Sequence, residues 1–140
     1  KKYCKKNNRK VYLSNNLKLA KKLNFDGAYI PSFNKILFNH KLGTKKNFQI
    51  IGSAHSIREI IIKQKQKVEL IFLSSIFKNF KNKRYLGICR FNSIANISKK
   101  KIIALGGINM NNIRQLRMTK SYGFASISFL QKECKIIKKN

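Results

Sequence analysis

Residues 102–109 read Ile-Ile-Ala-Leu-Gly-Gly-Ile-Asn, an apolar run that stops at two glycines and a polar residue. The β-branched and aliphatic residues predict a buried strand, and the polar segment after it, with Ile113 and Leu116 three residues apart, predicts a helix. Glycines at such a turn let the backbone approach a ligand closely, and free amide groups at a helix start favour an anion. Gly106 and Gly107 therefore predict either a plain strand-to-helix turn or a phosphate site.

A second apolar segment, residues 123–128, closes in the same way. It reads Gly-Phe-Ala-Ser-Ile-Ser, so that small and polar residues follow the apolar ones. In a (β/α)8 barrel, the loops after the last two strands commonly form a phosphate site. We therefore expect the ends of these two predicted strands to converge on one phosphate group.

Predicted strands recur along the chain with helical segments between them. They start near Val11, Ala28, Phe48, Glu69, Lys101 and Gly123. Alternating strands and helices are typical of a parallel sheet, in a barrel or in a doubly wound sheet. A complete (β/α)8 barrel takes about 250 residues, whereas this chain has 140. We predict an α/β fold of the TIM-barrel type, N-terminally incomplete, in which residues 1–140 form a single domain with about the last six β/α units.

The lack of the first two units leaves two edges in the predicted sheet. Residues 11–14 and 123–128 become edge strands, whose unpaired backbone groups invite pairing with another chain. We expect the 140-residue chain to form homo-oligomers or to aggregate through these edges.

The charge balance is strongly basic, with 32 Lys and Arg against 4 Asp and Glu and a formal net charge of +28. Such a surface attracts polyanions through counterion release. The basic residues are nevertheless spread along the whole chain, and no RNP, KH or zinc-finger signature accompanies them. We therefore favour a drift in composition, in which lysines merely solvate helix faces, over nucleic-acid binding.

The acidic residues limit the chemistry more than the basic ones do. Asp26, Glu59, Glu69 and Glu133 are all that the chain contains. A site built on paired carboxylates is disfavoured, and so is a magnesium cage made of the chain's own carboxylates. Asp26 lies in a predicted turn and is interpreted as a turn residue.

Cysteine usage and hydropathy indicate the compartment. Cys4, Cys89 and Cys134 are odd in number, far apart and without CxxC spacing, which argues against a disulfide framework and a zinc site. No apolar run approaches the roughly 20 residues of a membrane span. We predict a cytoplasmic chain without a membrane partner, with reduced thiols and with Cys89 buried.

Two predicted helices begin at capping residues. Asn15 or Asn16 can cap the first. Its expected apolar face consists of Leu17, Leu19, Ala20 and Leu23. Ser56 with Glu59 forms a capping box at the second, which explains both residues without any function.

His55 follows the predicted strand of residues 48–53 and is not explained by capping. It is either a satisfied structural histidine or a catalytic one, because barrel enzymes keep catalytic residues at the carboxyl ends of their strands. The residues alone leave both interpretations open.

Five short motifs occur in a characteristic order and spacing. They are residues 50–56 with Glu59, residues 71–77, Leu86-Gly87, residues 103–108 with Asn112, and residues 123–128. Together they resemble the thiamine phosphate synthase and thiazole tautomerase (TenI) family over nearly the whole chain, from Val11 to about Leu130. The resemblance implies a (β/α)8 barrel, which agrees with the fold predicted from the alternation of strands and helices.

In that family the synthase joins a pyrimidine diphosphate to a thiazole phosphate and releases pyrophosphate with the help of magnesium. The resemblance implies that the thiazole phosphate is cradled, chiefly by backbone amides, at Gly106, Gly107, Ile127 and Ser128. Ser53 resembles the serine that contacts pyrophosphate. Lys81 or Lys83 falls in the loop that holds the same group, where either ammonium would stabilise the leaving pyrophosphate.

The chain departs from the family pattern on the pyrophosphate and pyrimidine side. The family's Asn-Asp pair falls on Ser14 and Asn15, and its other acidic metal ligand falls on Asn34, so both magnesium carboxylates are amides. Amide oxygens can ligate magnesium but bring no charge, so the metal would depend mostly on substrate phosphates. Lys78 and Asn79 replace the proline and threonine of the phosphate loop. The family's pyrimidine-binding cluster would lie on a barrel strand that this chain does not contain.

The tautomerase branch needs less of the site. It shifts a proton on the thiazole phosphate without metal or pyrophosphate, and the resemblance puts His55 forward as its acid or base. Synthase is the leading prediction and thiazole tautomerase the alternative, both with small phosphate-bearing substrates as partners. A catalytically degenerate protein that binds phosphate or a polyanion is the third prediction.

Overall fold

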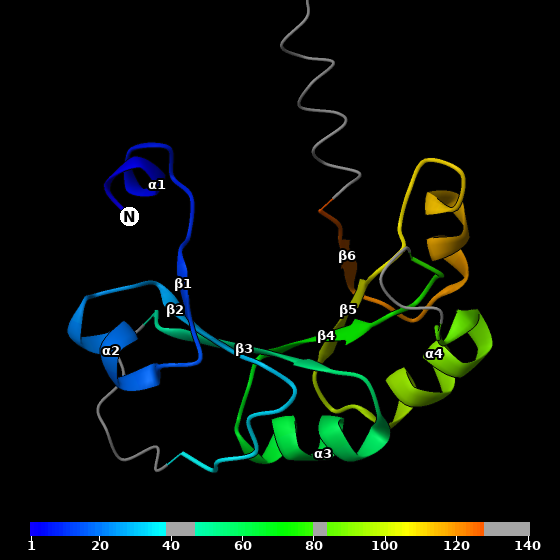
Figure 1. The fold of residues 1–140 in the computed structure, drawn as a ribbon, viewed down its shortest axis with the longest axis horizontal. Coiled ribbons are helices and arrows are strands. Elements are labelled where there is room, and N and C mark those ends of the chain that lie inside the picture. The colour runs from blue at the N-terminus through cyan, green and yellow to red at the C-terminus, as the bar shows by residue number, and fades with distance from the viewer. Residues whose placement is uncertain (39–46, 80–83, 128–140) are drawn as a thin grey trace, which may run out of the picture.

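The computed structural model describes residues 1–38, 47–79 and 84–127 (Figure 1). One parallel sheet contains, in chain order, β1 (Tyr12–Ser14), β2 (Gly27–Ile30), β3 (Gln49–Ala54), β4 (Leu70–Ser74), β5 (Lys101–Leu105) and β6 (Gly123–Ala125). The helices are α1 (Lys2–Lys6), α2 (Leu17–Lys22), α3 (Ile57–Lys65), α4 (Gly87–Ile97) and the 3-10 helix η1 (Ile113–Met118). The predicted α/β fold with parallel strands is confirmed.

The hydrophobic core lies between this sheet and the helices on its outer side. Alternate residues of a strand point to the same face, and parallel register aligns these positions across the sheet. The buried residues of the helix-facing side are Ala28, Ile30, Ile50, Ala54, Ile71, Leu73, Ile102 and Ala104. Ile60 of α3 and Phe91 of α4 pack into the same core and are wholly buried. Figure 1 shows α2, α3 and α4 along the outside of the curved sheet.

The inner face of the sheet is less completely covered. Tyr29, Phe72 and Ile103 lie on it and are half-buried. The rings of Tyr29 and Phe72 meet edge to face, with their centroids 6.3 Å apart. In a closed barrel such a face forms the packed interior. Among the described residues, β1 and β6 each pair with one strand only, so both are edge strands, as the sequence predicts.

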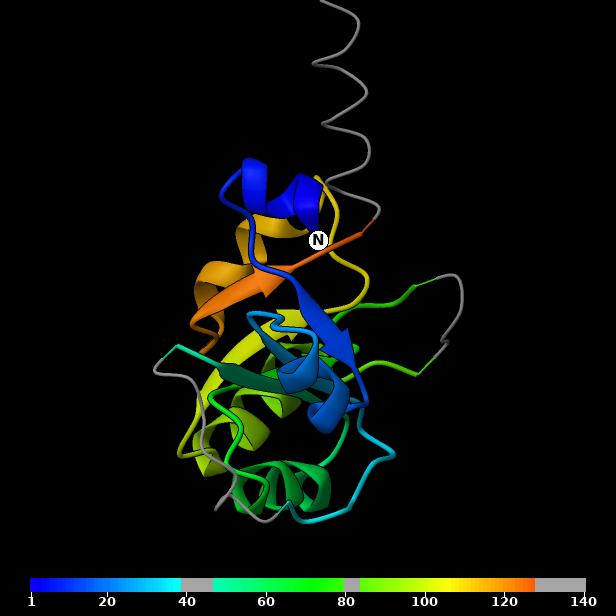
Figure 2. The ribbon, with the colours of Figure 1, turned by 90° about the vertical axis from the view of Figure 1, so that its left-hand side faces the viewer.

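The first helix stands apart from this core. α1 contributes no buried residue, and it lies at the opposite end of the molecule from α3 in both views (Figures 1 and 2). Across the described residues, none of the helices combines the length and hydropathy that a membrane span requires.

The apolar face predicted for α2 is confirmed at two of its four residues. Asn16 caps the helix, since its Oδ1 accepts a hydrogen bond from the Leu19 N–H at 2.9 Å. Leu17 and Ala20, three residues apart, are buried on one face, whereas Leu19 is 39% exposed. Leu23 is 47% exposed because α2 ends before it.

Three further local predictions differ from the structure. Cys89 is exposed rather than buried, because it lies about 200° around α4 from the buried Phe91, two residues away. The helix predicted at Ile113 and Leu116 is a 3-10 helix, although both side chains do pack against the core. The predicted strand of residues 123–128 ends at Ala125.

Candidate active site

The turn after β5 is held in a conformation that favours glycine. Gly106 and Gly107 have φ angles of +96° and +71°. A β-carbon at Gly106 would overlap the Ser75 side chain, and one at Gly107 would overlap the carbonyl oxygens of Phe77 and Lys78. The loop after β4 therefore presses against this turn, and packing against that loop requires both glycines without any ligand.

Polar side chains hold the same turn in shape. The Asn112 side chain accepts from the Asn109 N–H and donates to the Gly107 carbonyl, both at 2.8 Å. The Ser126 hydroxyl donates to the Ile108 carbonyl at 3.2 Å, which ties the segment after β6 to the turn after β5. Within the described residues, the Gly107 and Ile108 N–H groups donate to no protein acceptor. As far as the described residues go, this turn thus offers two amide donors of the kind that bind an anion.

The predicted phosphate cradle lies partly within the described residues. Leu105 pairs with Ala125 in the sheet, so the ends of β5 and β6 are neighbours. Ile127 follows shortly after and is 75% exposed. Ser128, like Lys81 and Lys83 of the pyrophosphate loop, lies outside the described residues.

His55 contacts the end of the neighbouring strand. Its Nδ1 lies 2.9 Å from the carbonyl oxygen of Ser74 and 3.1 Å from the Ser74 hydroxyl. Because a carbonyl oxygen only accepts, the shorter contact is a hydrogen bond when Nδ1 carries the proton, and Nε2 then keeps its lone pair. The His55 side chain is exposed, so Nε2 is accessible to a substrate.

The start of α3 fixes the backbone next to this histidine. Ser56 caps the helix by accepting from the Glu59 N–H at 3.3 Å, as predicted. The Glu59 carboxylate reaches back to the N–H of His55 at 2.6 Å, one residue before the position expected in a capping box. The cap therefore also orients His55.

The two serines of the predicted pyrophosphate side lie in different settings. Ser53 is 5% exposed on the inner face of β3, where its register partner is Phe72 of β4. Ser14 is the exposed last residue of β1. Asn79 donates to the Ser75 hydroxyl at 3.3 Å, and Ser75 in turn donates to the Phe77 carbonyl at 2.7 Å. Asn79 is thus built into the loop after β4.

Asn15 and Asn34, the two amides that the resemblance aligns with the family's magnesium carboxylates, contact each other. Asn34 Nδ2 donates to Asn15 Oδ1 at 2.7 Å. Asn34 Oδ1 accepts from the Ile36 N–H at 2.9 Å, which fixes the orientation of the amide. A nitrogen donor therefore lies where the resemblance predicts a metal ligand, and in this arrangement the pair does not fit magnesium. The described residues also hold no cluster of three or more His, Cys, Asp or Glu.

Lys63 and Gln66 lie beneath this pair and were not predicted from the sequence. Lys63 is wholly buried, and its Nζ donates to the carbonyls of Pro31 and Asn34 and to Gln66 Oε1 at 2.7–2.9 Å. Burial lowers the pKa of Lys63 to about 8, although the charge of Glu59 acts in the opposite direction. One lysine among 32 basic residues carries no sequence signal that marks it as buried.

The carboxyl ends of the strands therefore carry three separate groups of predicted residues. Asn15 contacts Asn34 after β1 and β2, His55 contacts Ser74 after β3 and β4, and the glycine turn meets the segment after β6. Carboxyl ends of parallel strands lie along one edge of a sheet, which is where barrel enzymes carry their active sites.

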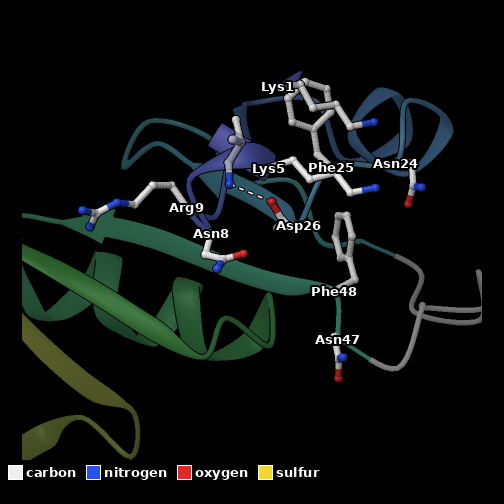
Figure 3. Close-up of a pocket in the computed structure, with 10 residues that line it drawn as sticks. Lys1, Lys5, Asn8, Arg9, Asn24, Phe25, Asp26, Asn47 and Phe48 are labelled. Carbon is white, nitrogen blue, oxygen red and sulfur yellow. Dashed lines mark hydrogen bonds between the residues drawn. The ribbon is translucent and has the colours of Figure 1, made fainter. Parts of the chain in front are cut away.

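A pocket of about 370 Å³ lies at the other edge, at the amino ends of β1, β2 and β3 (Figure 3). Lys5, Arg9, Phe25 and Phe48 line it, and Asp26 within it accepts a hydrogen bond from the Val11 N–H at 2.8 Å. It contains none of the predicted site residues. Asp26 acts as a structural acceptor there, in keeping with its interpretation as a turn residue.

Known proteins resemble this chain in sequence and in fold. A family model described as thiamine monophosphate synthase matches residues 1–130. The thiamine-phosphate synthase of Methanococcus vannielii is 33% identical over 82 residues, which are 56% of this chain and 40% of that protein. The chain thus spans less than half the length of this relative.

A solved structure, the thiamine phosphate pyrophosphorylase from Pyrococcus furiosus, superimposes with a TM-score of 0.66 at 20% identity and covers 91% of this chain and 61% of that one. At this identity the likeness shows the fold, and it supports the TIM-type architecture predicted above. The family match extends over all six described strands, as does the resemblance found in the motifs. The chain belongs to the thiamine monophosphate synthase family.

Proposed function

We propose that this chain is part of an enzyme of thiamine biosynthesis that couples a pyrimidine diphosphate to a thiazole phosphate and releases pyrophosphate. One observation carries the proposal: the glycine turn after β5 is tied to the segment after β6, and two of its N–H groups have no protein acceptor among the described residues. Loops after the last two strands of a barrel commonly bind phosphate. The named relatives support the same class of reaction.

The chain's own residues would bind and orient the thiazole phosphate at this turn. Backbone amides at a tight turn bind a phosphate without a charged side chain, because several N–H dipoles converge on its oxygens. Ser53 and Asn79 would face the pyrophosphate side. No step is assigned to magnesium, because Asn15 and Asn34 do not fit it.

The test is a turnover assay with the full protein and both substrates. Pyrophosphate release that requires both substrates is expected, together with calorimetric binding of thiazole phosphate alone. If thiazole phosphate binds but no substrate turns over, the chain is a degenerate phosphate-binding protein. Absence of thiazole phosphate binding would sink the proposal, and a salt titration with RNA would then test the polyanion alternative.

The contact between His55 and Ser74 favours a second candidate, a thiazole phosphate tautomerase. With its proton on Nδ1, His55 presents an accessible basic Nε2 at a strand end, as a proton shift on the substrate requires. Turnover of the thiazole phosphate tautomer without metal or pyrimidine substrate would support this candidate. No turnover there, with activity in the coupled assay, would leave synthase as the function.

A further inference from the structure

The carboxyl ends of β1 and β2 are joined by a contact between two side-chain amides. Asn15 directly follows β1 and has a φ of +57°, with its N–H donating to the Tyr29 carbonyl at 2.7 Å. Asn34 lies in the segment after β2. Its Nδ2 donates to Asn15 Oδ1, so one hydrogen bond spans the two strand ends.

The spacing of this pair is close to that of two ligands on one metal ion. Magnesium binds oxygens at about 2.0–2.1 Å in octahedral geometry, so two adjacent ligands lie roughly 2.9 Å apart. Asn34 Nδ2 and Asn15 Oδ1 are 2.7 Å apart. Two carboxylates at this distance would repel each other unless a cation lay between them. Two side-chain amides, in contrast, attract each other through a hydrogen bond and need no cation between them.

The segment after β2 is also clamped from the helix side. Lys63 donates to the carbonyls of Pro31 and Asn34, and Gln66 donates to those of Asn34 and Ile36, at 2.7–3.0 Å. Both side chains are wholly buried. The backbone that presents the Asn34 side chain is therefore held by α3, independently of Asn15.

We propose that the hydrogen bond between Asn15 and Asn34, backed by Lys63 and Gln66, takes the place of a divalent cation in tying the loop after β2 to the end of β1. The chain holds this part of its site in shape with protein groups alone. The inference concerns the site of the proposed function, but it does not depend on which reaction occurs there.

The experiment is a double-mutant cycle on the full protein, read by thermal unfolding with EDTA or with millimolar MgCl2 and no substrate. The wild type is expected to unfold at the same temperature in both. Either single change, Asn15→Asp or Asn34→Asp, keeps one amide that can donate to the new carboxylate and is expected to have little effect. The double variant is expected to unfold roughly 2–8 °C lower in EDTA and to recover in MgCl2.

The control variant carries Asn47→Asp and Asn96→Asp, which change the charge equally at exposed positions far from the pair. It is expected to show no more response to magnesium than the wild type. Should the double variant fail to fold in EDTA, its refolding on addition of MgCl2 is the supporting result. A wild type stabilised by magnesium, or additive single changes with no magnesium response in the double variant, would overturn the inference. Because no substrate is present, failure here is distinct from failure of the proposed function.

Discussion

Gly107 is the residue at which backbone geometry and the proposed phosphate site coincide. We predict that Gly107→Ala lowers the free energy of unfolding by roughly 2–4 kcal/mol, because a side chain resists positive φ and its β-carbon overlaps two carbonyl oxygens of the loop after β4. The added side chain would point at Phe77 and Lys78 of that loop. Chemical denaturation measures the loss.

Gly87 supplies the matched control for that prediction. It has a φ of +69°, close to that of Gly107, but a β-carbon would meet nothing within 4 Å. Gly87→Ala should therefore lower the free energy of unfolding only by the cost of placing a side chain at positive φ, about 1–2 kcal/mol. Equal losses of the free energy of unfolding in the two variants would contradict the contact between position 107 and the loop after β4.

The substitution His55→Asn separates the hydrogen bond to Ser74 from the role of the imidazole as a base. The side-chain amide of His55→Asn can still donate to the Ser74 carbonyl but supplies no base. If the tautomerase candidate is right, we expect this variant to lose about 10²–10⁴-fold in turnover of the tautomer while its melting temperature stays near that of the wild type. An unchanged rate would assign His55 a structural role.

Contacts between residues close in sequence were predictable, and contacts between residues far apart in sequence were not. Asn16 and Ser56 cap helices as expected, because a cap depends on neighbours within one turn. Lys63 had no local signal, since its partners Pro31 and Asn34 come from another unit. The contact between Asn15 and Asn34 likewise joins residues that no sequence period relates.

At the scale of the element, α3 carries a buried ammonium whose titration should be visible in stability. Its ordinary pKa of 10.5 falls to about 8 in the folded state, with Glu59 as the nearby carboxylate. Between these values the unfolded state holds a proton that the folded state has released, so stability rises with pH in this window. We expect the free energy of unfolding to rise by at most about 3 kcal/mol over this window. The rise is smaller to the extent that water reaches the ammonium.

Lys63→Met should remove this rise, while Lys65→Met, an exposed lysine on the same helix, should keep it. Urea titrations at pH 8 and at pH 10 would compare the three proteins. A pH dependence that is the same in all of them would show that other lysines cause it.

Strand positions were predictable because each strand combines an apolar run with a polar end. The helices were less predictable, as α2 and η1 show. α2 is too short to bury all the predicted leucines. The three-residue spacing of Ile113 and Leu116 fits a 3-10 helix as well as an α-helix, so it did not decide between them. In both helices, contacts with the sheet decide the form that the helix takes. A local sequence pattern does not contain these contacts.

At the scale of the whole molecule, β1 and β6 form the two edges of the sheet as far as residues 1–38, 47–79 and 84–127 show, and the inner face is only half-buried. We expect the 140-residue chain to associate with increasing concentration, because an edge strand can pair with a strand of another chain. Multi-angle light scattering would measure this. Phe124→Lys on β6 should reduce association, whereas Met118→Lys, exposed outside any strand, should not. A stable monomer at all concentrations would contradict the expectation.

Lys63 of α3 packs over Gly52 of β3, and this contact limits which residues the two positions can take. A β-carbon at Gly52 would lie 3.0 Å from Lys63 Cδ and 3.2 Å from the Ile30 carbonyl oxygen. A side chain at position 52 would therefore press on the long side chain of Lys63 and on the backbone of β2. An alanine at 52 would be accepted most easily together with a shorter side chain at 63, so the two positions are expected to be inherited as a pair. A chimera that imports α3 from a relative without β3 would break that pair.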